Sequence, residues 1–132
     1  MMRARLVRLA RDRRGASAIE LAFALPVFVL LLIGVFEFGR LFLTWSTIQY
    51  AAEQTGRFAM SRPAATASEL TAFLKERIHG IARNSIAISV TPETVAGVPY
   101  MVIVARVHFS FVGLIPVPPI DLEGRSRVPM VN

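Results

Sequence analysis

The chain has 132 residues, of which 54% are hydrophobic, and its formal net charge is +6. This length leaves room for one small domain besides any membrane segment, and the absence of cysteine excludes disulfide bonds, thiolate metal sites and a cysteine nucleophile. The sequence shows no glycine-rich phosphate loop, nucleotide-binding fingerprint or internal repeat, so we expect neither an enzyme nor a cofactor.

The positive charge is concentrated at the N-terminus. Six arginines occur within the first fourteen residues and are opposed only by Asp12. A nucleic-acid-binding protein would spread its charge over a folded surface, whereas positive charge next to an apolar segment is typical of the cytoplasmic flank of a membrane span. We therefore expect residues 1–15 to form a basic cytoplasmic leader, and we expect no nucleic-acid partner.

The following segment, residues 16–36, contains a single charged side chain, Glu20. About 20 helical residues cross a hydrocarbon core of about 30 Å at about 1.5 Å per residue. The sequence therefore predicts a transmembrane helix over 16–36 in contact with the lipid bilayer. The arginine-rich side should stay in the cytoplasm. This orientation predicts a single-pass protein of the bacterial inner membrane with an extracytoplasmic C-terminal part.

A cleaved secretory signal peptide is the alternative interpretation of this segment. It would have an apolar core of about 7–15 residues followed by small residues at a cleavage site, whereas this core is longer and leads into bulky and charged residues from Glu37 onward.

Pro26 lies inside the span. Because proline removes a backbone donor, a kink near Ala22 is predicted, either as a functional hinge or without a function.

Glu20 lies only five residues into the apolar run. A carboxylate costs about 2.5–3.5 kcal/mol at the middle of a membrane and less near the interface. Its side chain either reaches back to the headgroups or pairs with a positive charge on another subunit. If the chain were cut after Gly15, Ala16 would carry a new α-amino group and Glu20 would be the fifth residue, as in the prepilin pattern.

The residues around this position carry a wider resemblance. The segment Arg14–Pro26, with the sequence RGASAIELAFALP, and the later sequence Glu37-Phe38-Gly39-Arg40 together resemble the TadE-like family. These are minor pseudopilin-like proteins of the tight-adherence (Flp-type) pilus system. The resemblance covers about residues 13–60. Leu21 stands where major Flp pilins usually have tyrosine, which favours a minor component over the main filament subunit.

The resemblance implies a function in pilus assembly. A prepilin peptidase would cut between Gly15 and Ala16, and Glu20 would neutralise the N-terminal amine of a neighbouring subunit. The implied partners are other pilin and pseudopilin subunits and the pilus assembly platform, with no small-molecule substrate. The alternative is an uncleaved single-pass membrane adaptor of a secretion or envelope complex.

Residues 37–62 are predicted to continue the helix outside the membrane, up to the proline at 63. Glu37 and Arg40, three residues apart, are expected to pair at the outer membrane interface. A stripe of small and apolar residues follows at three- and four-residue spacing: Ile48, Ala51, Ala52, Thr55 and Ala59. Such a stripe suits close helix packing, with packing against the protein's own sheet favoured over packing against another helix.

Residues 63–132 are predicted to form a small α+β domain. Thr66 and Glu69 fit a capping box at the start of a short helix with the apolar series Leu70, Phe73, Leu74, Ile78 and Ile81. Alternating residues then predict strands from Ile86, from Met101 to Phe111 and from Leu122, with a turn at Gly97-Val98-Pro99 and the third strand at an edge.

The predicted fold class is thus α+β: a long N-terminal helix, one short helix and a three-stranded antiparallel sheet with helices on one face. About 70 residues make a marginal core, so packing against the long helix or partner subunits should be needed. His79 and His108 are the only histidines. No neighbouring carboxylate or serine motif is apparent for a catalytic triad, and no metal-ligand spacing is seen.

Overall fold

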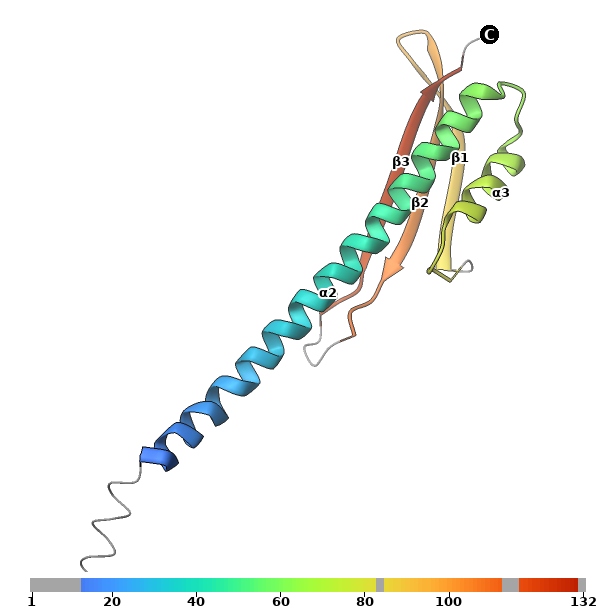
Figure 1. The fold of residues 1–132 in the computed structure, drawn as a ribbon. Helices are drawn as coiled ribbons and strands as arrows, with labels where there is room; N and C mark the ends of the chain where they lie inside the picture. Colours follow the sequence, from blue (N-terminus) through green and yellow to red (C-terminus); the bar gives the residue numbers. More distant parts are fainter. Residues whose placement is uncertain (1–12, 83–84, 113–116, 131–132) are drawn as a thin grey trace, which may run out of the picture. The chain divides into compact units, whose positions relative to one another are not determined.

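The structure is a computed structural model that describes residues 13–82, 85–112 and 117–130. Residues 1–12, and with them most of the predicted basic leader, lie outside the described residues. The chain divides into two compact units, Met1–Phe36 and Glu37–Asn132. Helix α2 (Arg13–Ser61) contributes residues to both units (Figure 1).

The first unit contains the N-terminal part of α2. From Gly15 to Phe36 nearly every side chain is exposed, including the large apolar residues Phe23, Leu31 and Phe36. A helix with apolar side chains on all sides and no protein around it needs an apolar surrounding. The α2 segment Gly15–Ser61 is long and apolar enough, by length and composition, to cross a membrane, and it therefore fits a membrane anchor.

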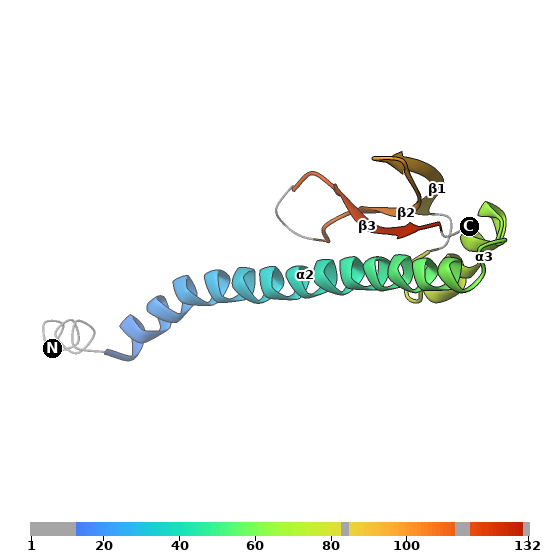
Figure 2. The same ribbon diagram turned by 90° about the horizontal axis from the view of Figure 1, so that it is seen from above.

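The second unit confirms the predicted fold class. Helix α3 (Ala67–Arg77) follows α2, and the strands β1 (Ile86–Val95), β2 (Val98–Phe109) and β3 (Ile120–Pro129) form an antiparallel sheet in the order β1-β2-β3. Seen from above, the part of α2 that belongs to this unit runs along one side of the sheet (Figure 2). The third strand is at an edge of the sheet, as predicted.

The hydrophobic core lies between the helices and the sheet. Ile48 of α2, Leu74 of α3 and Ile103 of β2 belong to one cluster and are completely buried. Ala51 and Thr55 are also completely buried, and the hydroxyl of Thr55 donates to the Ala51 carbonyl oxygen at 2.8 Å. The small-residue stripe thus packs against the protein's own sheet, as the sequence favoured.

The backbones of helix and sheet approach each other closely at Gly124 of β3. A Cβ atom added there would lie 2.7 Å from the carbonyl carbon and oxygen of Ile48 and 2.8 Å from the backbone nitrogen of Gln49. About two helical turns further along α2, Gly56 lies against Ser126 and Val128. These contacts show that α2 and β3 run side by side in the same direction within this unit.

The side chain of Gln49 bonds to the free edge of β3. The Arg125 backbone N–H donates to its Oε1 atom at 3.0 Å, and its Nε2 atom donates to the Arg125 carbonyl oxygen at 3.3 Å. Arg125 is opposite Val104 in the ladder with β2. Its backbone groups are thus satisfied by a side chain of α2 on the side without a strand neighbour.

The predicted capping box of α3 is confirmed. The Glu69 backbone N–H donates to the Thr66 hydroxyl at 3.3 Å, and the Thr66 backbone N–H donates to the Glu69 carboxylate at 2.7 Å. The pKa of Glu69 is lowered below its ordinary value of 4.5. The hydrogen bond from the Thr66 backbone contributes most, followed by the bond from the Thr66 hydroxyl. Burial opposes this lowering, and the charge of Arg62 adds a weaker lowering.

Two local predictions were right about the element and wrong about its bounds. The first hairpin turns at Ala96 and Gly97, which both have positive φ (50° and 81°), while Val98 and Pro99 already pair with β1. Two residues with positive φ match the twist of the flanking strands. The apolar series of the short helix also extends too far, because α3 ends at Arg77 and Ile78 is extended (φ −88°, ψ 111°), although its side chain stays buried.

Candidate functional site

The predicted processing and assembly residues lie on the first turns of α2. Gly15, Ala16 and Glu20 are exposed, and a Cβ atom added to Gly15 would have nothing within 4 Å. Among the residues that the structure describes, Glu20 has no ion-pair partner. The segment is therefore accessible on the helix surface. Processing and the assembly function of Glu20 remain predictions.

Pro26 lies inside α2, which is helical on both sides of it. Because proline has no backbone N–H, the Ala22 carbonyl oxygen lacks its usual helical donor. The kink near Ala22 that follows from this chemistry stays a prediction.

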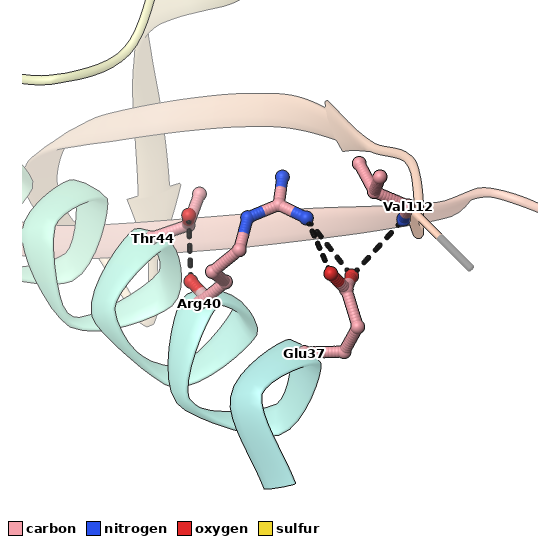
Figure 3. A network of polar contacts seen from close by, with 4 residues as sticks. All are labelled: Glu37, Arg40, Thr44 and Val112. Carbon is pink, nitrogen blue, oxygen red and sulfur yellow. Dashed lines mark hydrogen bonds and ion pairs between the residues drawn. The ribbon is translucent and has the colours of Figure 1, made fainter. Parts of the chain in front are cut away.

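Glu37 forms the best-connected polar site of the second unit (Figure 3). Its side chain is only 9% exposed, and both carboxylate oxygens accept from Nη1 of Arg40, at 2.8 and 2.9 Å. Oxygen Oε2 also accepts from the backbone N–H of Val112 at 3.1 Å. The carboxylate thus connects the beginning of this unit's helix to the chain that follows β2.

Arg40 strengthens the same connection. Its guanidinium group lies 5.2 Å from the ring centroid of Phe109, the last residue of β2, in the range of a cation–π contact. Its backbone carbonyl oxygen accepts from the Thr44 hydroxyl at 2.9 Å (Figure 3). One charged pair on α2 therefore holds both the last residue of β2 and the backbone three positions later.

The sequence predicted only part of this arrangement. The spacing of Glu37 and Arg40 predicted an ion pair on one helix face, and the two side chains do pair. Their predicted location at the outer membrane interface remains a prediction. The bond to Val112 was missed, because a backbone donor 75 positions away leaves no signal in the side-chain pattern.

Replacing Glu37 with alanine should release the chain after β2. The Val112 amide would lose its acceptor, and we expect the free energy of unfolding to fall by about 1–3 kcal/mol and hydrogen exchange at Val112 to accelerate. Hydrogen-exchange mass spectrometry of the full chain in detergent would measure both. Glu76→Ala is the control, because Glu76 is exposed on α3 and its replacement makes the same chemical change away from the β2–β3 connection. Equal effects of the two substitutions would contradict a connecting role of Glu37.

The sheet face opposite the helices carries exposed ion pairs between strands. Arg106 donates to Glu123 at 2.9 Å, and Arg127 donates to Glu93 at 2.7 Å. His108 lies 2.8 Å from Asp121, so the expectation that no carboxylate is near this histidine was wrong. The antiparallel register places the two residues opposite each other, and Asp121 is 13 positions away. Both side chains are more than 60% exposed, as is typical of a solvated surface pair.

Within the described ranges, no group of three or more histidine, aspartate or glutamate side chains could hold a metal ion. His79 is exposed, and its Nδ1 atom lies 3.1 Å from the Arg77 carbonyl oxygen at the end of α3. The ion pairs Arg106–Glu123, His108–Asp121 and Arg127–Glu93 connect strands of the same sheet.

The fold and the polar site define a class of protein: a membrane-length apolar N-terminal segment of α2, followed by a small α+β unit in which a charged pair of α2 is bonded to the chain after β2. Residues 15–57 match the family model of the TadE-like proteins, which confirms the resemblance over this segment. The match contains Glu20, Pro26 and the Glu37–Arg40 pair. The comparisons with curated proteins and with solved structures gave no match.

Proposed function

We propose that this protein is a TadE-like minor pilin or pseudopilin that takes part in the assembly of a Flp-type (tight adherence) pilus. It is anchored in the bacterial inner membrane by α2, with its N-terminus in the cytoplasm and residues 37–132 outside. The observation that carries the proposal is the family match over residues 15–57. The match begins at the predicted cleavage position and includes the exposed apolar helix.

Processing would change the electrostatics at the start of the helix. Cleavage after Gly15 by a prepilin peptidase removes the basic leader and leaves an α-amino group on Ala16. An amine and a carboxylate that are each costly to bury in a membrane become tolerable as a pair. The rise of an α-helix separates Ala16 and Glu20 by about 6 Å. The amine of one subunit therefore meets Glu20 of its neighbour when the two helices are shifted along their axes by about one turn.

The exposed apolar surface of α2 supports a function in assembly. Phe23 is 76% exposed and Leu31 is 59% exposed, and the small residue Gly34 has nothing within 4 Å of an added Cβ. Lipid covers these side chains while the subunit is in the membrane. Helices of other subunits replace the lipid on assembly, because association of apolar helices depends on close packing between them.

The mass of the intact protein tests the proposal. The protein would be purified from membranes of a host with its own prepilin peptidase. A mass that begins at Ala16, with or without an added methyl group, supports processing and pilus assembly. A mass that includes Met1 or Met2 would instead indicate the alternative, an uncleaved membrane adaptor.

A variant at the cleavage position serves as the control. Gly15→Leu should retain the leader because the peptidase then meets a bulky residue at the cut. The substitution is sterically tolerated, since nothing lies within 4 Å of an added Cβ. A Gly15→Leu protein that is still shortened to Ala16 would show that the cut does not depend on a prepilin-type site.

A further inference from the structure

The second unit has exposed apolar side chains at the end where α2 enters it. We call them the proximal rim: Phe38, Phe42 and Trp45 on α2, and Val112, Val117 and Ile120 on the connection between β2 and β3. Their exposed fractions range from 37% for Ile120 to 70% for Val112. Large apolar groups gathered at one end of a small unit indicate a surface that is covered in the functional protein.

The three rim residues of α2 share one helix face that does not face the sheet. Positions 38, 42 and 45 follow the spacing of one helical face. Glu37 and Ile48 are buried on another face, toward the sheet. The rings of Phe42 and Trp45 lie 6.1 Å apart. The helix therefore packs with one side on its own sheet and presents an aromatic stripe on a different side.

A residue that closely follows β2 and the first residue of β3 lie near the start of this unit's helix. Val112 is bonded to Glu37. Ile120 is opposite Phe109 in the sheet, and the Phe109 ring lies over Arg40. The exposed residues Val112 and Ile120 thus lie near the first helical turn of this unit, and Val117 precedes Ile120 by three positions in the sequence. From Phe111 to Ile120 the sequence contains no polar side chain.

The length of the apolar helix places this end of the unit at a membrane boundary. Glu20 is best accommodated at the inner boundary because a carboxylate is less costly there than in the hydrocarbon core. Counting about 20 residues from Leu21, which is what a core of about 30 Å requires, extends the span to about Arg40, beyond the predicted bound at residue 36. Phe38 then lies just inside the outer end of the core, and Phe42 and Trp45 lie just beyond it. The proximal rim then lies where the outer headgroups begin. Aromatic side chains such as Trp45 are enriched at that level.

We propose that the proximal rim inserts into the outer headgroup–acyl boundary of the bilayer, so that the extracytoplasmic unit is docked on the lipid surface. Lipid is favoured over a second copy of the chain because the rim continues, along one helix, the apolar surface that lipid already covers. Glu37 is compatible with this depth, since its charge is paired with Arg40 and bonded to Val112. The inference rests on the proposed membrane insertion of α2 but not on processing after Gly15.

The experiment uses the full chain in vesicles of phosphatidylethanolamine and phosphatidylglycerol, with or without bromine on the acyl chains. Bromine quenches only fluorophores that reach the acyl region. The single tryptophan, Trp45, is a natural probe.

Because the chain has no cysteine, a dye can be attached to one introduced cysteine at a time. Val117→Cys tests the rim, and Val98→Cys at the β1–β2 hairpin is the matched control, since the two valines are 46% and 43% exposed. Val29→Cys reports insertion of α2.

We expect brominated lipid to quench Trp45 and the dye at position 117 several-fold more strongly than the dye at position 98. Equal quenching at 117 and 98, with strong quenching at 29, would overturn the docking while leaving the membrane anchor intact. If, in that case, the dyes attached to position 117 of different molecules quench one another, a second copy of the chain covers the rim in place of lipid. Absence of quenching at position 29 would overturn both the membrane insertion and the docking.

Discussion

Pilus formation is expected to be lost when Glu20 is replaced by glutamine. The amide cannot neutralise the α-amino group that processing creates on a neighbouring subunit, so that amine would be buried without a partner charge, a strongly unfavourable state. Membrane insertion should be unaffected, because glutamine is less costly in a membrane than an ionised carboxylate. Electron microscopy of cells that carry the variant, with membrane fractionation to measure insertion, provides both readouts.

Glu76→Gln is the control for this experiment. It makes the same chemical change at an exposed position of α3 and should leave piliation normal. Normal piliation in the Glu20→Gln cells would exclude the charge-neutralising mechanism. A loss of the Glu20→Gln protein from the membrane fraction would also contradict it, because the substitution would then act on insertion.

A marked loss of stability is expected from Gly124→Ala. The added methyl group would come within 2.8 Å of three backbone atoms of Ile48 and Gln49. Backbone atoms cannot rotate away as a flexible side chain can, so α2 and β3 must separate. Overpacking of this kind typically costs about 1–3 kcal/mol and occasionally more. Denaturant unfolding of the full chain in detergent, followed by circular dichroism of the sheet, measures the change.

Gly39→Ala is a matched control with the opposite expected sign. Gly39 lies within α2 with nothing within 4 Å of an added Cβ. Glycine to alanine inside a helix stabilises it by about 0.5–1 kcal/mol. If Gly124→Ala were as stable as Gly39→Ala, the close packing of α2 on β3 would be wrong.

The sequence predicted the elements whose signal is local. Ile48, Ala51 and Thr55 recur at helical spacing, and they form the buried face of α2. The Thr66–Glu69 motif predicted the start of α3 because both capping bonds connect residues only three positions apart in the sequence. Alternating residues predicted strands because burial has the same period of two in β3 and in β2 from Ala105 to Phe109. From Val102 to Ala105 of β2, by contrast, all four residues are buried.

The missed features depend on which distant segments meet. The pairs Glu37–Val112 and His108–Asp121 follow from the register of the sheet and from the position of α2 on it. Register results from the packing of many side chains at once, and no single motif contains it. The hairpin turn was misplaced because Pro99 is a strong turn residue, whereas positive φ at Ala96 and Gly97 depends on the twist of both strands.

The bonds between Gln49 and Arg125 affect the tendency of this protein to aggregate through its strand edge. An exposed strand edge is a template for sheet growth between molecules and a frequent origin of aggregation. Gln49 occupies the amide and carbonyl groups of Arg125 in the middle of β3, so a strand from another copy could not pair along this edge without displacing that side chain. This edge of the sheet is thereby protected from irregular strand pairing between molecules.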